Sequence, residues 1–125
     1  MNVTTMDFFD LPEWLGTESV VWSATSALQQ TPQVSGALTS GEQRQQLDLL
    51  AVDAAYPRPV CPAVQRQQAH QAWQLGQVAL VDIDGRLAVA VPGSDFDANL
   101  ACEVVRRVAK AVGAASRHFT VSIAL

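Results

Sequence analysis

The chain has 125 residues, 49% of them hydrophobic, so it can form one domain with a core that needs neither disulfides nor metals. Its formal net charge is −4 and its single lysine is Lys110, which argues against nucleic acid as the main partner, because phosphate binding requires clustered basic charge. Charged residues make up 16% of the chain, below the roughly 25% typical of soluble proteins. This low charge predicts that part of the surface is covered, by a homodimer or by another protein.

The N-terminal sequence MNVTTMDFFD is acidic and lacks the apolar core of a signal peptide. No apolar run approaches the ~20 residues that a membrane-spanning helix needs. The two cysteines, Cys61 and Cys102, are then expected to be reduced thiols. Together these features predict a cytoplasmic protein without a membrane partner.

The first elements in chain order are a frayed end, residues 1–6, and a short helix. Asp10 has the position of a helix cap, with Pro12 in the first turn and Gly16 at the end. Four large apolar side chains accompany this segment: Phe8, Phe9, Trp14 and Leu15. A short aromatic segment of this kind either docks on its own domain or inserts into a sister subunit, and both alternatives stay open.

Three strands are expected next. Alternation of apolar and polar residues predicts a strand over 19–28 with one buried face. A weaker strand over 33–39 follows, then a polar loop over 40–46 and a strongly apolar strand over 47–54.

A stiff connector and a helix come after these strands. Pro57, Pro59 and Pro62 enforce an extended backbone. Pro62 also suits the first turn of a helix, which Gly76 is expected to end as the residue just past its last turn.

The residues 77–91 predict a β-hairpin closed by Asp84-Gly85, because this dipeptide favours the two-residue type I′ turn. The register that this turn sets places Leu80 opposite Val89 and Val81 opposite Ala88. Both faces of the hairpin are then apolar, which is typical of strands that are central in a sheet or covered on both sides.

A helix is predicted from a cap at Ser94, with Asp97 three residues later in a capping-box arrangement, to Gly113. Its apolar arc is nearly twice the ~100° of an ordinary surface helix. The helix is therefore expected to touch a second surface besides the sheet, either another segment of the chain or another protein. The interface candidates are Trp14, Phe96, Ala101, Cys102, Val105 and Ala109.

The last predicted element is a strand over 119–125, whose parallel or antiparallel pairing the sequence leaves open. The element order predicts a single α+β domain over residues 1–125. We expect one twisted, mainly antiparallel sheet of five to six strands with two main helices packed on one face.

Cys61 is the one candidate for a catalytic nucleophile, because a thiol at a helix N-terminus can have a lowered pKa. Its natural base would be His70, but that residue is predicted on the solvent-facing arc, which is a poor geometry for a Cys–His pair. The alternative interpretation of Cys61 is a packing side chain. Cys102 is predicted to pack on the flank of its helix.

Asp48, Asp53 and Asp82 raise the possibility of a metal or of acid–base catalysis. Asp48 and Asp53 are an odd number of residues apart on one strand and therefore point to opposite faces. No acidic pair has metal-ligand spacing, and no glycine-rich phosphate loop is present. The sequence predicts no metal and no cofactor.

The hairpin sequence DGRLAVAVP and the helix sequence SDFDANLACEVVRRVAKAV, in this order of elements, resemble the small acidic type III secretion chaperones and the related YbjN-like bacterial proteins. The resemblance covers roughly residues 10–112. It implies a dimer without enzymatic activity that binds a protein segment on its sheet or helix surfaces, and it transfers no functional residues.

The function predicted from the sequence is a protein-interaction module, chaperone-like or adaptor-like, without a catalytic centre. The alternatives are a small-molecule-binding protein or thiol-dependent enzyme that uses Cys61, and an enzyme built on Asp48, Asp53 or Asp82 if a pocket collects them.

Overall fold

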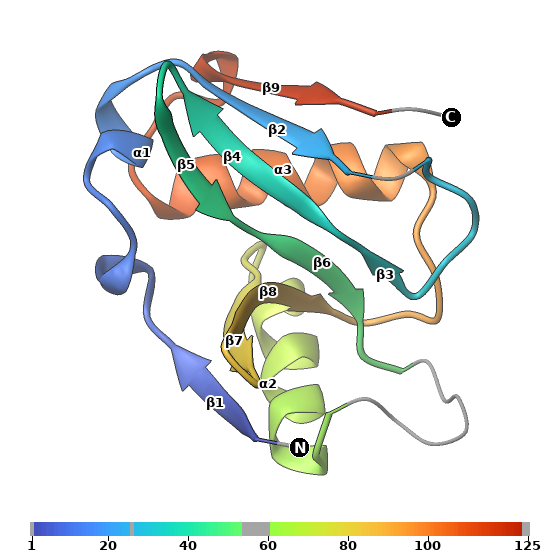
Figure 1. Ribbon diagram of the computed structural model, residues 1–125. Helices are drawn as coiled ribbons and strands as arrows, with labels where there is room; N and C mark the ends of the chain where they lie inside the picture. Colours follow the sequence, from blue (N-terminus) through green and yellow to red (C-terminus); the bar gives the residue numbers. More distant parts are fainter. Residues whose placement is uncertain (1, 26, 54–60, 124–125) are drawn as a thin grey trace.

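The computed structural model describes residues 2–25, 27–53 and 61–123, which form an α+β fold with two sheets (Figure 1). The strands are β1 (Val3–Met6), β2 (Val20–Ala24), β3 (Gln33–Val34), β4 (Gly36–Ser40), β5 (Gln43–Gln46), β6 (Asp48–Ala51), β7 (Ala79–Ile83), β8 (Arg86–Val91) and β9 (Phe119–Ser122). The helices are α1 (Trp14–Thr17), α2 (Ala63–Gln74) and α3 (Ala98–Ala111), with 3₁₀ turns η1 (Phe8–Asp10) and η2 (Ser116–His118).

The expectation of a single sheet is corrected. One sheet has five strands in the order β1-β7-β8-β6-β3, and the other has four in the order β5-β4-β2-β9. A long hairpin joins the two sheets: its arms β3–β4 and β5–β6 break at Ser35 and at Leu47, where the chain leaves one sheet for the other. At this break the Leu47 N–H donates to the Gly36 C=O at 2.9 Å and the Leu47 C=O accepts the Trp22 indole N–H at 3.0 Å.

The sequence predicted both main helices on one face of the sheet, and this is wrong. Beneath α2, the buried Val81, Ala88 and Ala90 form a cluster on one side of the five-stranded sheet. The larger cluster lies on the other side, where Leu80 and Val89 pack with the buried face of α3 and with the inner face of the four-stranded sheet. α2 therefore covers one face of β7 and β8, whereas α3 contacts β9 and belongs to the cluster on the other side of the five-stranded sheet (Figure 1). The hairpin, which is apolar on both sides, is thus covered on both.

The predicted hairpin is confirmed. β7 and β8 pair antiparallel with Leu80 opposite Val89 and Val81 opposite Ala88. Asp84 and Gly85 both have positive φ, 51° and 87°, as the type I′ turn requires. The hairpin lies at the centre of its sheet, between β1 and β6.

The helix ends agree in part with the sequence. α2 begins after Pro62 and is followed by Gly76 with φ 78°, as expected. α3 begins later than predicted, because Asp97 rather than Ser94 caps it and accepts the Leu100 N–H at 2.8 Å. The preceding residue, Phe96, is fully buried and its N–H donates to the Thr31 C=O at 2.7 Å, which holds the chain extended up to the cap.

Three further expectations change. Within the segment expected to be frayed, Val3–Met6 forms β1, which pairs antiparallel with β7. Within the predicted polar loop, Gln43–Gln46 forms β5, the edge of the four-stranded sheet. Asp7 rather than Asp10 caps the first helical turn, and it accepts the Phe9 N–H at 2.9 Å.

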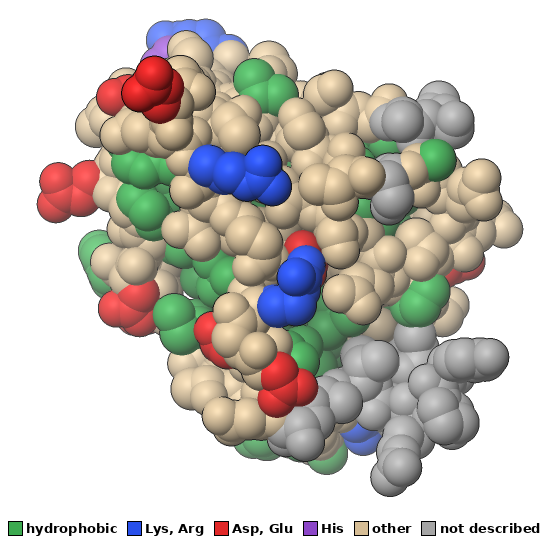
Figure 2. Space-filling view, in the orientation of Figure 1, with side chains coloured by type: hydrophobic (Ala, Val, Ile, Leu, Met, Phe, Trp, Pro, Cys, Tyr) green, Lys and Arg blue, Asp and Glu red, His purple; other side chains and the backbone are tan. Residues whose placement is uncertain are grey.

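The C-terminal strand β9 pairs parallel with β2, which resolves the alternative that the sequence left open. No helix in the described part of the chain lies over the outer face of the four-stranded sheet (Figure 1), and neighbouring strands place Thr39, Val21 and Thr120 side by side. Figure 2 shows that uncharged atoms dominate the visible face, with few charged side chains. Part of the low charge is thus explained by serine, threonine and glutamine side chains that face solvent. None of the helices in the described part of the chain combines the length and apolarity that crossing a membrane requires.

Candidate functional site

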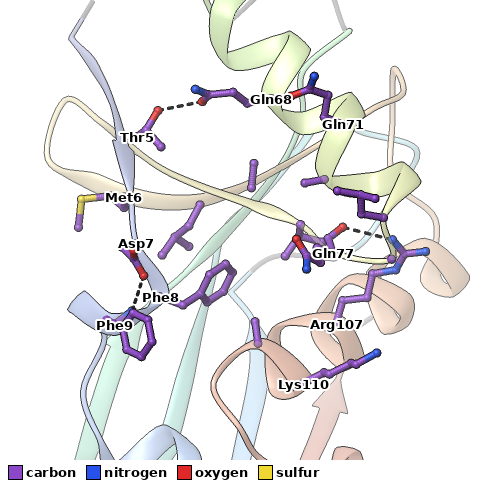
Figure 3. A pocket seen from close by; sticks show the side chains of 17 residues that line it. Thr5, Met6, Asp7, Phe8, Phe9, Gln68, Gln71, Gln77, Arg107 and Lys110 are labelled. Carbon is purple, nitrogen blue, oxygen red and sulfur yellow. Dashed lines mark hydrogen bonds between the residues drawn. The ribbon is translucent and has the colours of Figure 1, made fainter.

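A groove of about 740 Å³ lies between β1 and η1 on one side, α2 on another and α3 on a third, with the start of β7 as its floor (Figure 3). This volume is in the range of binding sites for small molecules and short peptides. The buried Val78 and Leu80 lie on the floor. Segments from both halves of the chain build it, so no local sequence motif corresponds to it.

Two large apolar side chains on the groove are exposed to solvent: Phe9, 95% exposed, and Leu75, 75% exposed. Phe9 belongs to the capped turn η1, and Leu75 is the residue that follows α2. In the described part of the chain, the other large apolar side chains exposed by more than a third are Val21 and Val64, which lie outside the groove. The most exposed apolar surface is therefore concentrated at one place.

The wall formed by α3 is basic. The Arg107 guanidinium stacks on the Trp73 ring, 3.6 Å from its centroid, and Nη1 donates to the Trp73 and Gln77 carbonyls at 3.1 and 3.2 Å. Lys110, one turn further along, also lines the groove. Asp7 is the single acidic residue among those that line it, and its carboxylate is occupied as a helix cap. Because Arg107 is paired with Glu103, the positive charge of this wall comes from Lys110, which has no ion pair in the described structure.

Glu103 holds this wall in place. Its carboxylate accepts the Arg107 Nε–H at 2.9 Å and also binds Arg106. Hydrogen bonds from Arg106 and then from Arg107 lower the pKa of Glu103 below its ordinary value of 4.5.

We predict that a Glu103→Gln variant is less stable than the wild type at neutral pH, by about 0.5 kcal/mol, because these ion pairs are partly exposed. The pKa of Glu103 is lower in the folded protein than in the unfolded chain. The stability that its ion pairs contribute is therefore fully present at a pH above the unfolded-state pKa, and it is lost as the pH falls through the folded-state pKa. The stabilities of the two proteins, measured by urea unfolding, should therefore converge as the pH falls below the lowered pKa of Glu103. A Glu42→Gln control, at an exposed residue without an ion pair in the described structure, should match the wild type throughout. A difference that persists in acid would contradict this origin of the stability.

The structure does not support Cys61 as a nucleophile. Cys61 is 2% exposed within the cluster beneath α2, and burial raises the pKa of its thiol even though Arg66 acts in the other direction. A raised pKa disfavours the reactive thiolate. His70, its expected base, instead binds Asp53, with 2.9 Å between Nε2 and Oδ1.

Cys102 is exposed, although the sequence predicted that it packs. It lies beside Phe119 and Val121 near the outer edge of β9.

A thiol-selective disulfide reagent should therefore react rapidly with the folded protein at Cys102 and leave Cys61 intact until urea unfolds the chain. In a Cys102→Ser variant the rapid phase should disappear, whereas a Cys61→Ser variant should retain it in full. Rapid labelling of folded Cys102→Ser protein would show that Cys61 is accessible.

The three aspartates raised by the sequence lie at separate places. Asp48 is buried and paired with Arg86, and Asp82 accepts the Gly85 N–H at 2.8 Å in the hairpin turn. Asp53 accepts the Gly93 N–H at 2.8 Å besides its bond to His70. Burial acts to raise the pKa of Asp53, but these hydrogen bonds outweigh it and lower the pKa. Over residues 2–25, 27–53 and 61–123 no group of three histidine, cysteine or acidic residues could hold a metal ion.

Most of the predicted interface residues lie inside the domain. Four of them are at most 1% exposed: Phe96, Ala101, Val105 and Ala109. The wide apolar arc of α3 is thus covered by the chain itself, and these side chains are not available to a partner in this conformation. Trp14 is half-buried and Cys102 is exposed, and neither lines the groove.

Phe9 and Leu75 were not among the predicted interface residues, and no local pattern in the sequence marks either side chain as exposed. Comparison of the chain with family models, with curated proteins and with solved structures found no match.

Proposed function

We propose that this protein is a binding module without catalytic function and that the groove between β1, α2 and α3 holds a short peptide segment of another protein. The concentration of exposed apolar surface carries the proposal: Phe9 and Leu75 stand uncovered at the same groove. Large exposed apolar side chains beside a concave polar surface are typical of interaction sites.

The chemistry of the walls supports a peptide as the ligand. Side-chain amides of Gln68, Gln71 and Gln77 line the groove beside the apolar residues (Figure 3). Amides can both donate and accept hydrogen bonds, as the peptide backbone does. Arg107 and Lys110 favour a segment that carries a carboxylate. The resemblance to secretion chaperones likewise implies a protein that binds a segment of another protein. A cytoplasmic location and a homodimer remain predictions.

Selection from a library of short randomised peptides against the full chain tests this function. We expect binders with micromolar affinity, because the groove is small and open. A Phe9→Ser or Leu75→Ser variant should weaken binding about tenfold, which corresponds to the burial of one apolar side chain.

A Val64→Ser variant is the matched control, because Val64 is also exposed on α2, by 53%, but does not line the groove. It should bind like the wild type. If all three variants lost peptide affinity equally, or if none lost any, the peptide would bind at another place on the protein. Sedimentation of the free protein would show whether a second copy occupies the groove instead.

A further inference from the structure

The edge of β7 is only partly occupied. In an antiparallel pair, every second residue directs its N–H and C=O to the same neighbouring strand. The Asp84 N–H donates to the Asn2 C=O at 2.9 Å, and Asp82 and Leu80 lie opposite Thr4 and Met6. The even-numbered residues of β7 therefore face β1.

Val78 is the next residue on that edge, and no strand among residues 2–25, 27–53 and 61–123 pairs with it. β1 ends at Met6, opposite Leu80, and the chain then turns away into η1. Within the described part of the chain, neither the N–H nor the C=O of Val78 has a hydrogen-bond partner. Val78 is 5% exposed on the floor of the groove. Buried main-chain groups without partners are costly, so this position favours a ligand that supplies them.

The line of β1 sets the direction of such a ligand. A peptide that pairs antiparallel with β7 at Val78 runs from the end of β1 toward Gln77. The Gln77 C=O accepts the Arg107 Nη1–H, so this peptide ends at Arg107, with Lys110 in the same wall. At the end of α3 the Val112, Gly113 and Ala114 N–H groups occupy the Val108, Lys110 and Ala109 carbonyls, so these three carbonyls do not face a ligand unpaired.

The length of free edge favours a chain end. β1 closes the groove on one side of Val78, and the turn at Gly76 with Arg107 closes it on the other. A peptide placed between these limits can pair with β7 only at Val78, so the segment that enters must be short. An antiparallel peptide meets the two cations with its carboxyl end, whereas a parallel one would bring its amino end there.

We propose that the groove binds the C-terminus of a partner protein as a short strand antiparallel to β7, hydrogen-bonded to the main chain of Val78 and with its terminal carboxylate at Arg107 and Lys110. This inference rests on the proposed peptide-binding function. Side chains beside the pairing residue then contact Phe9 and Leu75, so apolar C-terminal residues are preferred. Strand addition combined with capture of a carboxylate gives affinity from the backbone and specificity from the end group.

Two libraries of short randomised peptides separate the terminus from an internal segment: one with a free C-terminus and one flanked on both sides. Binders from the first library are then synthesised as the acid and as the amide. The acid should bind about tenfold more tightly, because a charge-assisted contact is lost in the amide. On binding of the acid, the Val78 amide proton should shift in the NMR spectrum and become protected from hydrogen exchange.

Lys110→Gln should remove the preference for the acid without weakening the amide. Arg44→Gln is the matched control, because Arg44 is exposed, has no ion pair in the described structure and does not line this groove, and it should keep the preference. Equal affinity for the peptide acid and the peptide amide, or a Val78 N–H that is not protected from exchange, would overturn the strand model. If peptide binding were still weakened by Phe9→Ser, the groove would remain the binding site. Failure of both libraries to yield a binder at about 1 mM would instead reject the peptide-binding function itself.

Discussion

A Gly36→Ala variant should lose about 3 kcal/mol of the free energy of unfolding, a large part of the stability of a domain of this size. A methyl group on Gly36 would lie 2.5 Å from Cε2 and 2.8 Å from Nε1 of Trp22, and closer still to Cζ2. Trp22 is fully buried and its indole N–H is fixed on the Leu47 C=O, so the ring cannot move aside without breaking that bond. The methyl group must then displace the backbone at the break between the two sheets.

Urea unfolding followed by tryptophan fluorescence measures this loss. Ser35→Ala is the control, because Ser35 adjoins Gly36 and its side chain makes no hydrogen bond in the described structure. It should change stability by less than about 0.5 kcal/mol. In a Trp22→Leu background the added cost of Gly36→Ala should fall below about 1 kcal/mol, because the indole ring is gone. The same cost in both backgrounds would show that the glycine is needed for another reason.

An Arg86→Ala variant should be the second most destabilised, by about 2–3 kcal/mol. Arg86 donates to Oδ2 of Asp48 through Nη2 at 2.7 Å and through Nε at 3.0 Å. Asp48 is 1% exposed, so the variant would leave a buried carboxylate with only the weak contacts from Gly36 and Gln33. The Arg86 side chain is 55% exposed, which lets water approach and keeps the cost below that of a fully buried pair.

Combination with Asp48→Asn distinguishes the charge from the packing. The double variant removes both charges and should be more stable than the sum of the two single losses predicts. Arg44→Ala, at an exposed arginine without an ion pair in the described structure, should stay within about 0.5 kcal/mol of the wild type. If Arg86→Ala lowered the free energy of unfolding by only that small amount, solvent rather than Arg86 would be compensating the charge of Asp48.

The α+β class, the central hairpin and the end of α2 followed from local signals in the sequence. The Asp84-Gly85 turn and the alternation around it depend on neighbouring residues only, and the register agrees with the structure. Sequence reasoning could not place the division into two sheets, because it depends on Trp22 meeting Gly36 and Leu47 across the fold. It also assigned the cap of α3 to Ser94, because the contact between Phe96 and Thr31 joins residues that are far apart in the sequence.

The candidate site was less accessible to sequence reasoning than the fold. The apolar arc of α3 was expected to be covered by another segment of the chain or by another protein, and the first alternative agrees with the core cluster, in which both sheets cover it. Phe9 lies within the three-residue turn η1 and Leu75 just past the last residue of α2, so periodicity carries no information about the exposure of either side chain. The open main chain of Val78 depends on where β1 stops, and that segment has no pattern that predicts a strand.

The parallel pairing of β2 with β9 has a consequence for how the protein folds. Val20 pairs with Phe119, about a hundred residues later, so this contact closes one of the longest loops in the domain. During synthesis β2 and β4 can pair early, whereas the β2 edge stays open until α3 and β9 have been made. Until then the inner face of β2, with Val20 and Trp22, is exposed to other chains. The slow step of folding should accordingly be the docking of α3 and β9, and nascent chains halted before Phe119 should be the species most prone to aggregate.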